Sequence, residues 1–89
     1  MLSENLLVRV GKGIGNARRL AILELLAKRK DLSLTQIAAE CRGDVRTIAE
    51  HVRKLTLAGL VMKRRAGPIV EHALSPRGRK VLRFIRNLD

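Results

Sequence analysis

Apolar residues recur at steps of three and four along most of this chain, the spacing that gives a helix one apolar face. The periodicity predicts helices over residues 1–10, 17–30, 44–58 and 76–88, with a further short helix starting at Ser33. Between residues 60 and 74 the pattern changes to two strand-like runs, separated by the turn signal Arg65-Ala66-Gly67-Pro68. We therefore expect an α+β fold that is mostly helical and contains one β-hairpin.

Residues 33–58 contain two successive predicted helices and are typical of a helix-turn-helix. Residues 31–33 lead into this helix-turn-helix, and we expect them to form a brief strand. Ser33 or Thr35 can cap the start of the first helix by accepting hydrogen bonds from free backbone N–H groups. At the break, Gly43 can adopt the positive φ that ends a helix, and Asp44 can cap the next one. A helix this short is not stable alone, so its apolar side must dock on the rest of the domain.

The second helix of this pair has two different sides. Its apolar side contains Val45, Ile48, Val52 and Leu55. The opposite side contains Arg46, Ala49, Glu50, Arg53 and Leu57, flanked by Thr47 and Lys54. With the apolar side docked, the other side is free to lie in a DNA groove, as a recognition helix does.

The predicted hairpin, residues 60–74, has a basic tip formed by Lys63, Arg64 and Arg65. Beside a helix-turn-helix, such a hairpin is a wing that contacts phosphates or the minor groove. The alternative is a solvated sheet edge that is protected by charge.

The last predicted helix, residues 76–88, starts at a clear signal, because Ser75 can cap it and Pro76 suits its first position. This helix is apolar on one surface, and it comes after the elements that already make up a domain. These two features favour pairing with a second copy of the chain. The alternative is packing on its own subunit. The expected dimer contacts are Leu6, Val81, Phe84, Ile85 and Leu88.

Length and charge narrow the class of protein. The 89 residues allow one domain, 1–89, and 19 Lys and Arg against 8 Asp and Glu give a formal net charge of +11. This balance indicates an anionic partner, and nucleic acid fits best. A membrane surface is disfavoured, since no stretch combines a basic face with a face rich in Trp or Phe. With no signal peptide or spanning segment evident, we expect a cytoplasmic, nucleoid-associated protein.

Other chemistry has little support. Phe84 is the single aromatic residue, which argues against single-strand binding by base stacking. Cys41 is the single cysteine, so no disulfide or thiolate metal site can form within one chain, although an intermolecular bridge remains open. The acids are scattered and no catalytic set is suggested, so an enzyme is not expected. No cofactor, metal or small-molecule effector is expected.

The chain resembles the winged-helix regulators of the ArsR and MarR type. Four segments carry the resemblance, and together they span almost the whole chain. The run from Gly15 to Leu26 is similar to the G-N-P-T-R-L-R-I-L-x-x-L opening of ArsR-like proteins, and Thr47 to Leu55 is similar to their recognition helix, T-V-S-R-H-L-K-x-L. Ala58-Gly59-Leu60-Val61 matches the A-G-L-V at the entry to their wing. Leu74 to Gly78 resembles the L-T-P-x-G that starts the last helix in MarR-like members.

This resemblance implies a homodimer with its recognition helices in successive major grooves of double-stranded DNA. By position, the base-facing residues would be Val45, Arg46, Ala49 and Glu50. His51 corresponds to a partly buried His of the family and is expected to be structural. The Cys-Val-Cys metal motif of ArsR proteins is replaced by Ile37-Ala38-Ala39-Glu40, so metal sensing is unsupported.

We expect affinity to come mainly from contacts to DNA phosphates and the counterions that they release. The candidate backbone contacts are Thr35, Gln36, Thr47, Arg53 and Lys54, together with the wing cations Lys63, Arg64 and Arg65. Arg46 is the candidate for reading guanine through a bidentate contact. Glu50 either accepts from a cytosine amino group or holds Arg46 or Arg53 in place.

Three other functions remain open from the sequence. The charge suits a nonspecific architectural DNA-binding protein as well as a regulator. Winged helices also serve RNA or ribonucleoprotein binding. The last helix and the wing could instead dock on another protein.

Overall fold

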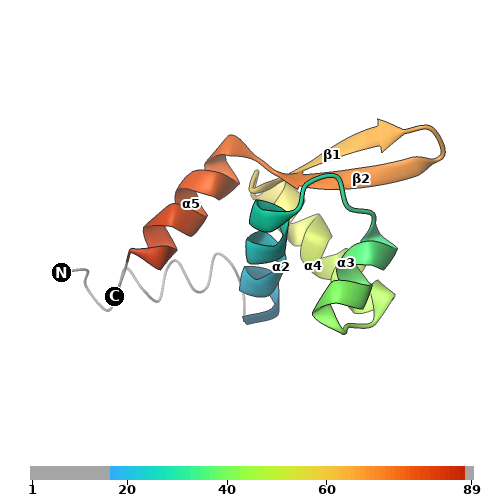
Figure 1. Cartoon of the computed structure of the whole chain (residues 1–89), viewed down its shortest axis with the longest axis horizontal. Helices are drawn as coiled ribbons and strands as arrows, with labels where there is room; N and C mark the ends of the chain where they lie inside the picture. Colours follow the sequence, from blue (N-terminus) through green and yellow to red (C-terminus); the bar gives the residue numbers. More distant parts are fainter. Residues whose placement is uncertain (1–16, 88–89) are drawn as a thin grey trace.

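The computed structural model describes residues 17–87, and it has the winged helix-turn-helix fold (Figure 1). The elements run in the order α2 (Ala17–Lys28), α3 (Leu34–Cys41), α4 (Val45–Leu57), β1 (Val61–Ala66), β2 (Ile69–Leu74) and α5 (Pro76–Arg86). The predicted α+β class and the order of the elements are confirmed over this range. The predicted helix over residues 1–10 and Leu88 lie outside the described residues.

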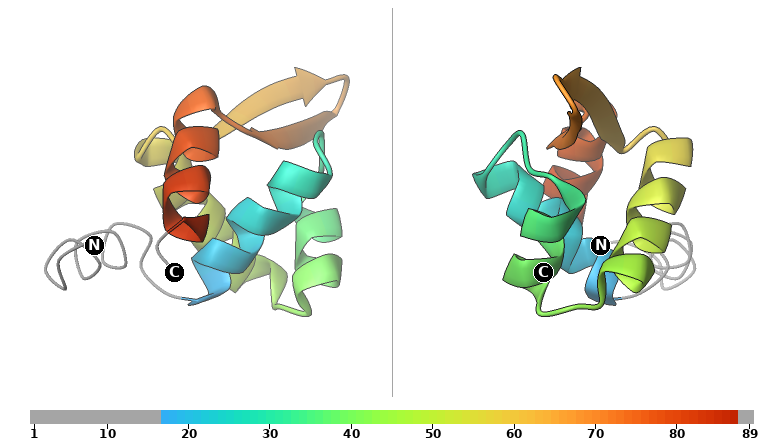
Figure 2. Two further views of the ribbon diagram at one scale, coloured as in Figure 1. Left: turned by 60° about the vertical axis from the view of Figure 1, so that its left-hand side comes forward. Right: turned by 90° about the vertical axis from the view of Figure 1, so that its right-hand side faces the viewer.

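Helix α2 is the centre of the domain. It lies between α5 on one side and α3 and α4 on the other, with the hairpin across one end (Figure 2). Its residues Ile22, Leu23 and Leu26 are buried, and they share one core with residues from every other element. The other core residues include Leu32, Ile37, Ile48, Val52, Leu55, Leu74 and Leu82. A single apolar core therefore fixes how the helix-turn-helix and the hairpin sit relative to each other.

Side-chain caps mark where the helices begin. Ser33 caps α3 in a capping box, in which its hydroxyl accepts from the backbone N–H of Gln36 and the Gln36 side chain accepts from the Ser33 N–H. The Asp44 carboxylate accepts from the Thr47 N–H at the start of α4, and Ser75 caps α5 ahead of Pro76. The predicted caps Asp44 and Ser75 are confirmed, and Ser33 rather than Thr35 caps α3.

The turn between α3 and α4 differs from the sequence prediction. Arg42, not Gly43, adopts the positive φ of 52° that ends α3, so the expectation for Gly43 was wrong. Gly43 is instead closely approached by two side chains. A Cβ there would lie 2.9 Å from Cδ1 of Ile48 and 3.1 Å from Nη1 of Arg18, closer than ordinary contacts allow. The glycine lets α2 and α4 approach the turn from both sides.

The hairpin is a regular antiparallel pair in which Val61 faces Leu74 at the base and Ala66 faces Ile69 at the tip. Leu32 adds an antiparallel bridge to His72, with reciprocal backbone hydrogen bonds of 3.1 and 2.8 Å. The brief strand expected between α2 and α3 is therefore present as this bridge. It fastens the base of the wing to the segment that leads into α3.

Helix α5 starts against the backbone of the wing. A Cβ on Gly78 would lie 2.1 Å from the carbonyl oxygen of Leu60, so only glycine fits there. The hydroxyl of Ser75 donates to the Gly59 carbonyl at 2.5 Å and accepts from the Gly78 N–H at 2.9 Å. These contacts fix the direction in which α5 leaves the hairpin.

Candidate nucleic-acid interface

Helix α4 has the two sides that its sequence predicts, except that Val45, which was expected on the docked apolar side, is 42 % exposed. Ile48, Val52 and Leu55 are buried in the core. The exposed residues on this helix are Val45, Arg46, Thr47, Glu50, Arg53, Lys54 and Leu57, and Ala49 is half-buried beside them. Leu57 is 74 % exposed. The side of α4 that would enter a groove is therefore open to solvent.

Glu50 and Arg53 form an ion pair on this exposed side. The guanidinium donates two hydrogen bonds to the carboxylate, Nη2 to Oε1 at 2.5 Å and Nε to Oε2 at 3.0 Å. The hydrogen bond from Arg53 holds the pKa of Glu50 below its ordinary value, and the same bond raises the pKa of Arg53. Of the two roles considered for Glu50, the structure shows it holding Arg53.

Arg46 differs from Arg53, because it makes no hydrogen bond or ion pair to any of residues 17–87 and its side chain is exposed. It lies in the first turn of α4, close to Asp44, which caps the helix. The guanidinium is therefore available to an external acceptor without first breaking an internal contact.

Three predicted backbone contacts, Thr35, Gln36 and Thr47, lie in the first turns of α3 and α4. All three are exposed. Thr35 Oγ1 is 3.0 Å from Ser33 Oγ, Gln36 completes the capping box, and Thr47 Oγ1 donates to Asp44 at 3.3 Å. These side chains shape the helix N-termini, where the helix dipole favours an anion.

The register of the hairpin places the three wing cations on two faces. Lys63 pairs with His72 and Arg65 with Val70, so these residues share the face that continues to the buried pair Val61 and Leu74. Arg64 points to the opposite face. There its Nη2 lies 3.1 Å from Glu71 and 3.4 Å from Asp31, and the hydrogen bond that it donates to Glu71 raises the pKa of Arg64.

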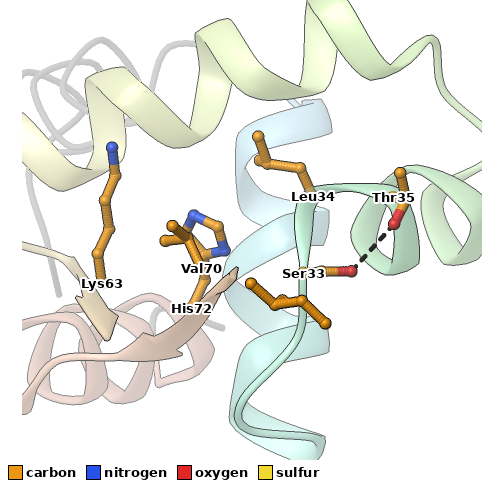
Figure 3. A pocket seen from close by; sticks show the side chains of 7 residues that line it. Ser33, Leu34, Thr35, Lys63, Val70 and His72 are labelled. Atoms are coloured by element: carbon orange, nitrogen blue, oxygen red, sulfur yellow. Dashed lines mark hydrogen bonds between the residues drawn. The ribbon is translucent and has the colours of Figure 1, made fainter. Parts of the chain in front are cut away.

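A pocket of about 330 Å³ lies between the wing and the N-terminus of α3 (Figure 3). Ser33 and Thr35 line one side, and Lys63 and His72 rise together from the hairpin on the other. His72 is buried, and its Nδ1–H donates to the Leu32 carbonyl at 2.9 Å. Lys63 of the wing, Ser33 at the cap of α3 and Thr35 in its first turn therefore border one hollow. No pattern in the sequence indicates this position for His72.

The residues expected at a dimer contact are only partly accessible. Phe84 is 37 % exposed, whereas Val81 and Ile85 are half-buried and pack against the core of their own subunit. Leu6 and Leu88 lie outside the described residues. Helix α5 therefore packs largely on its own subunit, and Phe84 is the apolar side chain that it leaves exposed.

Among residues 17–87 there is no group of three or more His, Cys, Asp or Glu that could hold a metal ion. Cys41 is half-buried, and burial raises the pKa of its thiol. No helix in this part of the chain is long and apolar enough to cross a membrane.

Sequence reasoning missed two arginines at the start of α2 that touch the helix-turn-helix. Arg18 Nη1 donates to the Cys41 carbonyl at the end of α3, at 2.5 Å. Arg19 Nε donates to Nδ1 of His51 on α4, at 3.1 Å. No periodic pattern signals these contacts, because they join residues 23 and 32 positions apart.

Comparison with known proteins agrees with this architecture. Residues 14–64 match the model of a family described as a helix-turn-helix domain. No curated protein matches the sequence. The structure is similar to the homodimeric winged helix-turn-helix DNA-binding domain of a possible ArsR-family transcriptional regulator from Mycobacterium bovis, with a TM-score of 0.77 and 25 % identity, over 100 % of this chain and 93 % of that one.

Two further solved structures are similar. One is a possible transcriptional regulator for arsenical resistance, with a TM-score of 0.72 and 27 % identity, covering 88 % of this chain and 80 % of that one. The other is a MarR family transcription regulator, with a TM-score of 0.75 and 25 % identity, covering 92 % of this chain and 59 % of that one. The chain therefore belongs to the helix-turn-helix domain family, in the winged form that ArsR and MarR transcriptional regulators share.

Proposed function

We propose that this chain is a sequence-specific transcriptional regulator that binds double-stranded DNA as a homodimer. The observation that carries the proposal is the exposed side of α4, where Arg46 makes no hydrogen bond or ion pair to residues 17–87, together with a wing whose Lys63 and Arg65 share the face that continues to the buried pair Val61 and Leu74. The function is binding rather than catalysis, and it would place the protein on the nucleoid.

Phosphate contacts supply most of the affinity in this proposal. The formal net charge of +11 favours a polyanion. Backbone contacts come from the first turns of α3 and α4 (Thr35, Gln36 and Thr47), from Arg53 and Lys54 on α4, and from Lys63 and Arg65 on the wing. If a dimer neutralises on the order of eight phosphates, the logarithm of the affinity falls with the logarithm of salt concentration at a slope of about −7.

Base readout rests on the other residues of the exposed side. Arg46 donates to guanine through a bidentate contact, while Val45 and Ala49 make apolar contacts with base edges. Glu50 takes no base in this proposal, because its carboxylate already accepts two hydrogen bonds from Arg53. Glu50 instead positions Arg53 for its contact with the DNA backbone.

The dimer in this proposal forms through α5, with Phe84 at its centre. The similar domain from Mycobacterium bovis is homodimeric, and Phe84 is an exposed aromatic residue on an otherwise basic helix surface. Twofold symmetry then places the two recognition helices in successive major grooves, with half-sites about 34 Å apart. A monomer at the concentrations where DNA binds would contradict this arrangement.

The second candidate is a nonspecific architectural DNA-binding protein, and the high net positive charge favours it. Selection of bound duplexes from a random pool separates the two candidates. A regulator enriches a short motif with twofold symmetry, whereas an architectural protein enriches none. The oligomeric state is measured alongside, by sedimentation or light scattering.

A further inference from the structure

The recognition helix is attached to α2 by a directional contact between two side chains. Nε of Arg19 donates to Nδ1 of His51 at 3.1 Å, in a partly buried position. The residues of α4 that are buried in the core, Ile48, Val52 and Leu55, are all apolar. Apolar burial is non-directional, so it holds the helix down but fixes its rotation less tightly. A hydrogen bond adds direction.

This hydrogen bond requires one protonation state of the imidazole. An arginine N–H can only donate, so Nδ1 of His51 must carry a lone pair and the proton of the neutral ring sits on Nε2. A second proton would place an N–H on Nδ1, facing the N–H of Arg19. The contact would then change from a hydrogen bond into two donors and two positive charges.

The charges around His51 act against that second proton. Burial lowers the pKa of His51 from its ordinary value of 6.5, and Arg19, Arg18 and Lys54 lower it further. Glu50 acts in the opposite direction. Its carboxylate is already occupied by Arg53, so it offers little compensation.

The neighbouring arginine extends the same attachment to α3. Arg18 caps the end of that helix through the Cys41 carbonyl, and its Nη1 also lies against Gly43 in the turn. The N-terminal end of α2 therefore holds both helices of the helix-turn-helix. A disturbance at Arg19 therefore occurs next to the residue that joins α2 to the end of α3.

We propose that Arg19 and His51 are positioning residues for the recognition helix, and that a proton on His51 releases this helix and weakens DNA binding. The inference rests on the proposed DNA-binding function. It makes the interface sensitive to acid in the range where histidine titrates.

The direction of the effect separates this inference from simple electrostatics. An added positive charge on a basic protein strengthens its attraction to DNA. Release of α4 has the opposite effect, because the DNA-competent orientation requires neutral His51. Affinity then falls by up to about ten-fold for each pH unit below the pKa of His51 in the free protein.

The first test uses His51→Asn, whose side-chain oxygen can take the place of Nδ1 as an acceptor without titrating. Affinity for a duplex is measured between about pH 7.5 and about pH 5 at constant salt. The wild type loses affinity relative to His51→Asn as the pH falls, while the two agree at the upper pH. The inference is overturned if the affinity of the wild type changes with pH as that of His51→Asn does, or if it rises relative to His51→Asn as the pH falls. His72 is present in both proteins, so its contribution cancels.

The second test needs no DNA and remains valid if the proposed function fails. NMR titration of the free protein reports the pKa of His51, in the wild type and in Arg19→Leu. We expect a value below 6.5 in the wild type and a higher value in Arg19→Leu, with faster amide exchange along α4 in the variant. A wild-type value at or above 6.5, or equal values in the two proteins, overturns the positioning role. If the wild type binds no duplex at any pH, while the NMR titration gives the expected pKa values, the proposed function alone is contradicted.

Discussion

Glu50 holds Arg53 in a two-point contact one turn along the recognition helix, while Arg46 on the same exposed side has no partner among residues 17–87. Two arginines on the same exposed side of the helix therefore differ in their freedom to meet DNA. A side chain that must leave an ion pair gains less from a new acceptor than one that is free. This difference leads to separate expectations for the two positions.

Glu50→Gln should raise affinity for any duplex, because it releases Arg53 and removes a negative charge from the interface. The salt slope should become steeper by about 0.9 for each additional phosphate that the protein neutralises. Binding of a mixed-sequence duplex across a salt series measures both. Glu40→Gln is the matched control, since it removes the same charge and releases Arg29, which lies outside α4. Equal increases in affinity for the two variants would show that net charge alone is responsible.

Arg46→Ala should reduce discrimination between duplexes by about 1–3 kcal/mol, the value of one bidentate contact to guanine. Nonspecific affinity should change by no more than the removal of one cation explains. Selection from a random pool, followed by affinity for the best and the scrambled site, checks this. Arg79→Ala, an exposed arginine on α5, serves as control. An unchanged preference in Arg46→Ala would remove this residue from base readout.

Lys63→Ala and Arg65→Ala should each weaken duplex binding and make the salt slope shallower, by about 0.9 for each phosphate that the variant no longer neutralises. Arg64→Ala should have less effect, because Arg64 lies on the other face of the hairpin and contacts Asp31 and Glu71. The three substitutions remove the same charge from consecutive positions, so they control for one another. Equal effects at all three would mean that the faces of the hairpin are not distinguished.

Gly78→Ala should destabilise the fold by about 1–3 kcal/mol or more, the usual cost of forcing extra atoms into a packed site. The new Cβ would lie 2.1 Å from the Leu60 carbonyl oxygen, which is backbone and cannot move aside easily. Urea unfolding followed by circular dichroism measures the change. Arg79→Ala, on the next residue, should be nearly neutral. A stable Gly78→Ala protein would show that α5 can shift away from the wing.

Acid should reduce the free energy of unfolding through His51. Because burial and Arg19 lower the pKa of His51 in the folded state, the unfolded chain binds the proton more readily below about pH 6.5. The contribution of neutral His51 to the free energy of unfolding is therefore fully present above this pH. It decreases as the pH falls toward the folded-state pKa of His51, and below that pKa the decrease levels off. Urea unfolding of the wild type and His51→Asn across this range isolates the contribution. Parallel profiles would exclude it.

Much of the fold could be predicted from the sequence because its signals are local. Periodicity located the ends of α2, α4 and α5 to within two residues. The caps Asp44 and Ser75 are equally local, because each side chain bonds a backbone N–H in the first turn of its own helix. The turn after α3 was mispredicted for a physical reason. Glycine tolerates positive φ, but here Arg42 adopts the left-handed conformation, while Gly43 is closely approached by the side chains of Ile48 and Arg18 from distant helices.

The sequence by itself determined that Ile48, Val52 and Leu55 of α4 are buried, that a hairpin follows, and that the chain carries a large excess of positive charge. These follow from periodicity and composition, which need no partner element. Only the tertiary structure decided that Glu50 holds Arg53, that Arg64 turns away from Lys63 and Arg65, and that Arg19 meets His51. Such pairings depend on strand register, rotamers and the packing of distant helices, and a linear pattern contains none of these distances.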